Sequence, residues 1–379
     1  LVGSEMCIRD RYYPDLPKRP CQHQLPPLLP LPPAAEAASA AQPDCGASPV
    51  DPSLMIPATP LRRPSLLDKA IASALLMITP EYRNVRRRQR GNGRSSTPTL
   101  AQPPAMPLET IELMGERIRI GRQRLAGAPT VLLICPLPQS IVAFSPIWPA
   151  LSARFDLVAV DLPGFGRSSG GLEWMTFAAQ GHFLKALIDQ LQLVRPHLVA
   201  PDVGMAAAVA CVGENPGIAA SLVIGDGPAI APSSNGSIIN KLVTSGFWRF
   251  MVAMAGAATF VEAGNRLGYV NYTPNPLEVD DYIRSYAGRV GPICRWFRDY
   301  PASLATTDPL LAKLDLPVQL FWGRHDALLD VENATRLQQR LPRAQLQVLE
   351  NAGHYSYQDA AEAFSNLVIR WVEGDHLRL

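Results

Sequence analysis

One stretch decides the fold, and it reads Val194-Arg195-Pro196-His197-Leu198-Val199-Ala200-Pro201-Asp202-Val203-Gly204-Met205-Ala206-Ala207-Ala208-Val209-Ala210. Its first half predicts a buried strand, and the Ala-rich second half predicts a helix that begins at once. Ala200 and Gly204 flank Asp202 with the spacing of a nucleophile elbow, a strained turn that accepts only small neighbours. The usual occupant of that turn is Ser, so Asp202 is a candidate nucleophile of an uncommon kind.

A simpler interpretation of Asp202 is a helix cap. A carboxylate in front of a helix accepts a backbone N–H and suits the positive end of the helix dipole. On this stretch alone the two interpretations are equally open. Residues elsewhere in the sequence are needed to distinguish a nucleophile from a helix cap.

The composition is that of a chain able to form one large α/β domain with a lid, or two domains. It has 379 residues, 47% of them hydrophobic, and a net charge of +2, which gives no reason to expect nucleic acid or an anionic membrane as partner. The six cysteines lack CxxC or metal-like spacing and favour a reducing compartment. We find neither a secretion signal nor an apolar run of roughly 18 residues. We therefore expect a cytoplasmic protein that takes a small-molecule substrate, without metal or cofactor.

Residues 1–107 differ from the rest because they hold 19 of the 37 prolines. Such a segment favours extended, solvated backbone. Its one helical candidate, 65–77, precedes an Arg-rich patch at 83–94, so a membrane-surface or targeting element is a second interpretation. Residues 1–11 resemble translated sequencing-adaptor sequence. We expect residues 1–107 to be an unstructured or non-native extension and the native chain to begin near Met106.

From residue 108 onward, strand-like runs alternate with helix-length amphipathic stretches, which predicts a mostly parallel sheet covered on both faces. The expected strands are 109–114, 117–120, 130–135, 156–161, the strand before Asp202, 219–224, 318–322 and 345–349. The expected helices are 144–155, 175–191, the Ala-rich helix to about 212, 331–341 and 359–372. Between 229 and 307 the pattern changes to aromatic-rich helical segments, which we interpret as a helical cap inserted into a core of residues 108–228 and 308–379.

Three motifs together resemble the α/β-hydrolase superfamily, in its capped branch with an Asp nucleophile that includes epoxide hydrolases and haloalkane dehalogenases. They are Asp161-Leu162-Pro163-Gly164-Phe165-Gly166-Arg167-Ser168, the turn around Asp202, and Asn351-Ala352-Gly353-His354. The resemblance covers about residues 108–375. It implies an α/β-hydrolase fold, with an eight-stranded sheet, helices on both faces and an inserted cap. The first motif is structural in that superfamily.

The resemblance also implies a catalytic triad in the order nucleophile, acid, histidine. Asp326 follows the seventh expected strand, and His354 follows the eighth, so both reach the edge of the sheet where Asp202 lies. Asp226, after the sixth strand, is the reserve acid, and His325 is the reserve base. By analogy, the backbone N–H groups of Leu137 and Val203 would form the oxyanion hole.

A carboxylate nucleophile suits displacement at a saturated carbon, which leaves an ester that activated water then cleaves. Epoxide hydrolases of this branch use two cap tyrosines as acids, and we expect Tyr269, Tyr300, Trp296 and Phe297 to bind substrate. Phe297 occupies the place of one such tyrosine when the segments are aligned without a gap. The first-choice substrate is a small apolar epoxide.

Three alternatives stay open. One is a haloalkane dehalogenase, although Val203 stands where those enzymes place a halide-binding Trp. Another is hydrolysis of an acyl or carbon–carbon bond, with Asp202 as a base for water. The third, from another class, is a ligand-binding member of the fold without catalysis, because the loop 135–138 departs from the usual His-Gly-x-Pro.

Overall fold

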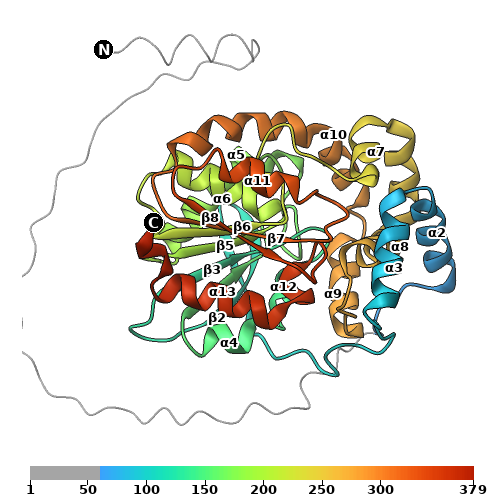
Figure 1. The fold of residues 1–379 in the computed structure, drawn as a ribbon, viewed down its shortest axis with the longest axis horizontal. Coiled ribbons are helices and arrows are strands. Elements are labelled where there is room, and N and C mark those ends of the chain that lie inside the picture. The colour runs from blue at the N-terminus through green and yellow to red at the C-terminus, as the bar shows by residue number, and fades with distance from the viewer. Residues whose placement is uncertain (1–59) are drawn as a thin grey trace, which may run out of the picture. The chain divides into compact units, whose positions relative to one another are not determined.

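The computed structural model describes residues 60–379, and its centre is an eight-stranded sheet (Figure 1). The strands lie in the order β1-β2-β4-β3-β5-β6-β7-β8. The β1–β2 and β2–β4 pairs are antiparallel, and the other neighbouring pairs are parallel. The strands are β1 (Leu108–Leu113), β2 (Glu116–Gln123), β3 (Thr130–Ile134), β4 (Asp156–Val160), β5 (His197–Pro201), β6 (Ser221–Gly225), β7 (Val318–Gly323) and β8 (Ala344–Leu349). This order confirms the expected fold class.

Helices cover both faces of the sheet. Figure 1 shows α5, α6 and α11 along one face and α4, α12 and α13 along the other. Their bounds are α4 (Trp148–Ser152), α5 (Phe177–Gln190), α6 (Val203–Glu214), α11 (Glu332–Gln338), α12 (Ser356–Asp359) and α13 (Ala361–Glu373). Every residue of β5, β6 and β7 is buried, as expected for parallel strands with a helical layer on each side.

The segment 144–155 is less helical than its pattern predicts. The structure has a 3-10 turn, η2 (Ile141–Phe144), followed by the five residues of α4. Proline lacks a backbone N–H and its ring clashes with the preceding turn, so it is tolerated only near the start of a helix. Pro149 lies in the first turn of α4, and together with Pro146 it prevents one continuous helix.

Residues 229–307, expected to form a helical cap, contain four helices. They are α7 (Ser237–Thr244), α8 (Gly246–Gly268), α9 (Pro276–Tyr286) and α10 (Val290–Thr307). α8 is broken at Gly256, whose φ of 79° is left-handed. The short 3-10 turn η4 (Asp308–Lys313) leads from α10 back to the sheet at β7.

The expectation of an unstructured segment before residue 108 is wrong for part of that segment. The structure has two further helices there, α2 (Leu66–Met77) and α3 (Pro80–Gly91). A capping box between Ser65 and Asp68 begins α2. Leu76 of α2 and Val85 of α3 are buried in an apolar cluster with Leu267 of the cap. The helical candidate 65–77 corresponds to α2, whereas α3, which falls mostly within the Arg-rich patch, was not expected. The part of the extension before residue 60 lies outside the described residues.

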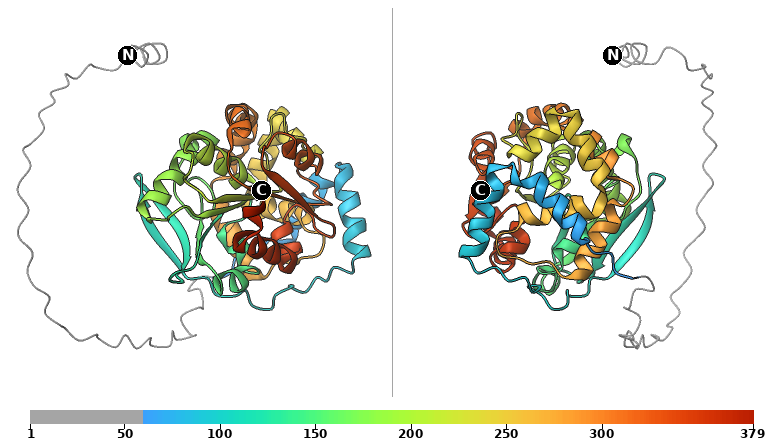
Figure 2. Two further views of the ribbon diagram at one scale, coloured as in Figure 1. Left: turned by 60° about the vertical axis from the view of Figure 1, so that its left-hand side comes forward. Right: turned by 90° about the vertical axis from the view of Figure 1, so that its right-hand side faces the viewer.

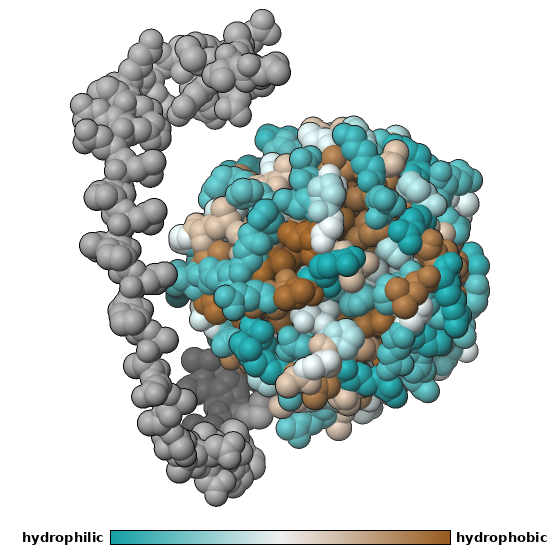
Figure 3. Space-filling model, turned by 90° about the vertical axis from the view of Figure 1, so that its left-hand side faces the viewer, coloured by the Kyte–Doolittle hydropathy of each residue, from teal (hydrophilic) through white to brown (hydrophobic). Residues whose placement is uncertain are grey.

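These outer helices lie on one side of the molecule. The right-hand view of Figure 2 shows α2 and α3, in blue, in front of the cap helices. Figure 3 shows the opposite side, where hydrophilic side chains surround several separate apolar areas. Within the described residues, no helix combines the length and the apolar character needed to cross a membrane.

Candidate active site

Asp202 occupies the sharp turn between β5 and α6. Its φ of 50° and ψ of −130° lie in a region that non-glycine residues rarely adopt. The neighbouring backbone leaves no room for larger residues, since a Cβ at Gly227 would lie 2.2 Å from the Asp202 carbonyl oxygen. The Asp202 side chain makes no capping hydrogen bond to α6. The geometry is therefore that of an elbow, and the helix-cap interpretation loses its support.

His354 lies between two carboxylates. Its Nδ1 is 2.9 Å from Asp326 Oδ2, and its Nε2 is 3.6 Å from Asp202 Oδ1. The exposed fractions are 6% for Asp202, 9% for Asp326 and 2% for His354. The backbone N–H groups of Leu328 and Leu329 donate to Asp326 Oδ1 at 2.8 and 2.9 Å, which fixes that carboxylate towards the imidazole. The three residues form a line from Asp326 through His354 to Asp202.

The two carboxylates also control the charge of His354. Burial lowers the pKa of this imidazole, but the charge of Asp326 and the hydrogen bond and charge of Asp202 outweigh burial and hold the pKa well above its ordinary value. The imidazolium is therefore the favoured form while both carboxylates are ionised.

The second oxygen of Asp202 is held by the backbone. The Leu137 N–H donates to Asp202 Oδ2 at 2.5 Å, so Pro136 does not prevent the loop after β3 from presenting this group. Val203 is the first residue of α6, and no hydrogen bond from its N–H is present within residues 60–379. One backbone N–H, that of Leu137, thus holds Oδ2 of Asp202, while Oδ1 lies beside His354.

Asp202 and His354 line a cavity of about 90 Å³. Trp296, Phe297 and Tyr300 of α10 contribute to its wall. Most of the remaining lining residues are apolar, and among the described residues no Lys or Arg lines it. Such a cavity suits a small, uncharged, mostly apolar ligand.

Comparison of the chain with models of protein families identifies its family. A family model for the alpha/beta hydrolase fold matches residues 129–361. The chain belongs to the α/β-hydrolase fold family. The matched range begins after α2 and α3, so these helices lie outside the part of this hydrolase that the family describes.

Individual relatives of this hydrolase are distant. A 2-hydroxy-6-oxononadienedioate/2-hydroxy-6-oxononatrienedioate hydrolase of Cupriavidus pinatubonensis is 23% identical, over 64% of this chain and 86% of that protein. Among solved structures, haloalkane dehalogenase DbeA from Bradyrhizobium elkani superposes with a TM-score of 0.62 at 24% identity, over 71% of this chain and 98% of its own. A membrane phospholipase A superposes with a TM-score of 0.60 at 20% identity, over 82% and 96%. The structural likenesses show the shared fold.

Tyr269 does not line the cavity of this hydrolase, contrary to expectation. It is fully buried, its hydroxyl accepts from Gln139 Nε2 at 2.6 Å, and it donates to Gln358 Oε1 at 2.6 Å. These bonds hold it in a polar network beneath the cap. Of the five cap tyrosines at 269, 272, 282, 286 and 300, the cavity is lined by Tyr300 alone. Sequence spacing could not tell them apart, because which face of a helix meets the cavity depends on how the cap packs.

The reserve acid and base lie outside the line of three residues. Asp226 is fully buried; it accepts from the Gly323 N–H at 2.8 Å and from the Ser356 hydroxyl. Burial, with the nearby charge of Asp326, raises the pKa of Asp226 well above its ordinary value. His325 does not line the cavity.

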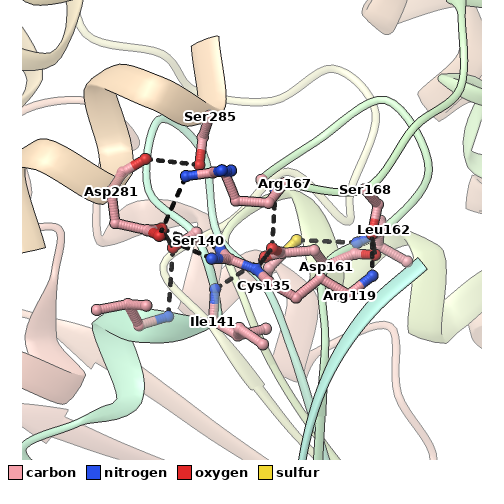
Figure 4. Close-up of polar contacts among 12 residues, drawn as sticks. Arg119, Cys135, Ser140, Ile141, Asp161, Leu162, Arg167, Ser168, Asp281 and Ser285 are labelled. Atoms are coloured by element: carbon pink, nitrogen blue, oxygen red, sulfur yellow. Dashed lines mark hydrogen bonds and ion pairs between the residues drawn. The ribbon is translucent and has the colours of Figure 1, made fainter. Parts of the chain in front are cut away.

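An ion-pair network that the sequence analysis missed ties the cap to the sheet (Figure 4). Arg119 of β2 donates from Nε to Asp161 at 2.6 Å and from Nη1 and Nη2 to Asp281 of α9 at 2.7 and 2.9 Å. Burial lowers the pKa of Arg119, but the two carboxylates outweigh burial and raise it. Asp161 also accepts from the Ile141 and Arg167 N–H groups, both at 2.8 Å. The motif that begins at Asp161 is thus held as a structural support beside the active site.

Metal ligands are not gathered anywhere in the described part of the chain. No group of three His, Cys, Asp or Glu side chains within residues 60–379 is arranged to hold an ion.

Proposed function

We propose that this hydrolase opens small apolar epoxides through a covalent ester on Asp202. One observation carries the proposal. Asp202 lies in a strained elbow with Oδ2 bound by the Leu137 N–H, Oδ1 beside His354, and both in an apolar cavity. A buried carboxylate with one oxygen held by a backbone N–H is oriented for attack on carbon by its other oxygen.

In the first step, Oδ1 of Asp202 forms a bond to a saturated ring carbon and the carbon–oxygen bond of the epoxide breaks. The released alkoxide takes a proton from the Tyr300 hydroxyl, which solvent later replaces. Burial raises the pKa of Tyr300 to about 12, so its hydroxyl is protonated at neutral pH. The hydroxyl donates to Asn235 Oδ1 at 2.8 Å, and it rotates from this acceptor to the alkoxide as the ring opens.

In the second step, His354 removes a proton from water, and the water oxygen attacks Cγ of Asp202. Negative charge develops on Oδ2, where the N–H groups of Leu137 and Val203 stabilise it. The ester bond then breaks, and the diol leaves with the proton from His354. Substrate and water together give one diol, and the enzyme is regenerated.

The electrostatics of His354 support this order of events. The negative charges of Asp202 and Asp326 raise the pKa of His354. Ester formation removes the charge of Asp202, so the pKa of the imidazole falls and the imidazole becomes able to act as a base. Asp326 then stabilises the imidazolium that forms when water is deprotonated.

Haloalkane dehalogenation is the second candidate, because enzymes of that name share the fold. The donors available for a halide count against it. Val203 offers no side-chain donor, and the Trp296 Nε1–H already donates to the Met175 carbonyl at 2.9 Å. Two relatives are named as hydrolases of dioates, but a dianionic substrate finds no cation in the described wall of the cavity. The same absence counts against carbon–carbon bond hydrolysis of such a substrate. A ligand-binding role without catalysis does not account for the alignment of Asp202, His354 and Asp326, because binding an apolar ligand requires no such ionisable groups.

A single turnover in ¹⁸O-labelled water tests the proposal. With a terminal epoxide as substrate, the covalent route inserts solvent oxygen into the Asp202 carboxylate, and mass spectrometry of the peptide containing Asp202 detects it. If Asp202 acted only as a base for water, label would enter the diol and not the peptide. The same assay with a haloalkane, read by halide release, separates the two candidates. Asp202→Asn is the control, and it should neither turn over nor take up label.

A further inference from the structure

Helix α2 contributes to the same cavity as the proposed nucleophile. Leu75 and Leu76 of α2 line the cavity together with Asp202 and His354. Leu76 is fully buried and Leu75 is half-buried. The side chains therefore reach the substrate pocket from a segment nearly 130 residues before the elbow in the chain.

Polar contacts fix α2 on the cap at two points. Asp68 Oδ1 accepts from the Thr259 hydroxyl at 2.9 Å, and the Ser73 hydroxyl accepts from Arg266 Nη1 at 3.0 Å. Thr259 and Arg266 both belong to α8, and Thr259 itself lines the cavity. Thr259 and Arg266 lie about two turns apart on the same face of α8. The two hydrogen bonds therefore fix the position of α2 and direct Leu75 and Leu76 towards the cavity.

The exposure of α2 places it on the solvent side of the cavity, since Leu66 and Leu67 are largely exposed while Leu76 is fully buried. Leu137 and Val203, near the reacting carboxylate, belong to the main core. Leu76 belongs to a separate apolar cluster with Leu267 and Leu328, and these two residues also line the cavity. Leu75 packs against the main core, and the Leu328 N–H donates to Asp326 Oδ1. Both clusters therefore border the cavity, and α2 closes it on the side that faces solvent.

We propose that α2 is a second lid, whose Leu75 and Leu76 form the outer wall of the pocket and set the length of apolar substrate that fits. The inference rests on the proposed function in one respect, namely that the substrate occupies this cavity. A substrate bound through its epoxide at Asp202 extends its chain towards the outer wall. A hydrophobic pocket discriminates about 10- to 200-fold for each methylene gained or lost, so a change of one wall side chain alters the preferred chain length.

The test uses a series of 1,2-epoxyalkanes of increasing length with the full chain. Leu75→Ala and Leu76→Ala should each move the optimum of kcat/KM to longer substrates and lower it about 10-fold for short ones. Leu76→Phe, which adds volume, should move the optimum to shorter substrates. Leu66→Ala and Leu67→Ala are the matched controls on the same helix, since these leucines are 86% and 69% exposed and should leave the profile unchanged.

An unchanged length profile in both Leu76 variants overturns the inference. Loss of α2 packing in Leu76→Ala would also broaden the profile, so the melting temperature is measured beside it. Leu76→Phe keeps an apolar contact at this position and must still shift the optimum to shorter chains.

Binding of straight-chain alcohols, measured by calorimetry, separates this inference from the proposed reaction. If no variant turns over epoxides but the alcohol length preference changes with Leu76, the second lid stands and the epoxide reaction fails. If epoxides are turned over while both the alcohol and the epoxide profiles ignore Leu76, the reaction stands and the lid fails.

Discussion

At the scale of single residues, Tyr300 is the side chain that separates epoxide opening from other displacement reactions. Tyr300→Phe removes the proton donor for the leaving alkoxide and should lower kcat for an epoxide by about 100-fold or more. Steady-state kinetics with a terminal epoxide measure this loss. Tyr269→Phe is the matched control, because the Tyr269 hydroxyl is bound to Gln139 and Gln358 away from the cavity. Equal losses in both variants would contradict the role of Tyr300.

In the proposed mechanism His354 acts only in the second step, so its removal should separate the two steps. His354→Gln keeps Asp202 able to attack and removes the base for water, which should lower turnover about 100- to 10,000-fold. The ester should then accumulate, and the intact protein mass should increase by the mass of the substrate. Protein that stays unlabelled after incubation with epoxide would argue against a covalent intermediate.

The residues of the site differ in how well the sequence could predict them. Asp202, Asp326 and His354 each follow a strand end, and parallel strands bring their carboxyl ends to one edge of the sheet. Local patterns predict these strand ends, and the resemblance to the α/β-hydrolase superfamily supplies the strand order that brings them together. The cap tyrosines depend on helix rotation and on the packing of α8 against α10, and the sequence carries no comparable signal for these. Tyr269 was therefore expected in the cavity and lies in a polar network instead.

At the scale of elements, Arg119 joins strand β2 to cap helix α9. Arg119→Met leaves the fully buried carboxylate of Asp161 without its cation, and leaves Asp281 with Arg167 at 3.8 Å. The change should cost about 3–5 kcal/mol of unfolding free energy. Urea unfolding measures the loss. Arg324→Met is the control, because its pair with Glu350 lies on the surface and such pairs contribute about 0–1 kcal/mol. Similar losses for the two variants would mean that Arg119 does not hold the cap.

The start of α9 should make stability depend on pH. Burial raises the pKa of Glu278 from 4.5 to about 7, so the folded state binds a proton more tightly than the unfolded chain. Stability is therefore fully present below pH 4.5 and falls as the pH rises towards 7, by about 3 kcal/mol at most. His354, whose pKa is also raised, shifts stability in the same direction at higher pH. Glu278→Gln should flatten the melting temperature between pH 4.5 and 7, whereas a slope equal to the wild type would exclude this carboxyl as its source.

The α2–α3 pair shows how average composition misleads at this scale. A segment rich in proline was expected to be unstructured, yet a capping box at Ser65 and Pro80 at the start of α3 are ordinary helix signals. What the sequence could not supply is the cap surface on which these helices pack. By contrast, strands β3 to β8 are apolar in sequence, and their predicted bounds agree with the structure to within a few residues.

At the scale of the whole molecule, the outer helices should be required for a stable cap. A chain of residues 106–379 loses the partners of Leu267 and Val270 and opens one end of the cavity. We expect its melting temperature to fall by several degrees, since 1–3 kcal/mol per exposed large apolar side chain is lost. Differential scanning calorimetry of both chains measures the change. A truncated protein as stable as the full chain would support the earlier expectation that residues before Met106 are foreign to it.

The position of α2 on α8 also affects how the chain is made. Asp68 and its partner Thr259 are 191 residues apart, so at about 5–20 residues per second of synthesis the first waits about 10–40 s for the second. Throughout that interval Leu76 and Val85 have no surface to cover them. The newly made polypeptide therefore leaves the ribosome with Leu76 and Val85 uncovered, and these two side chains reach their place in the apolar cluster only after the cap has been translated.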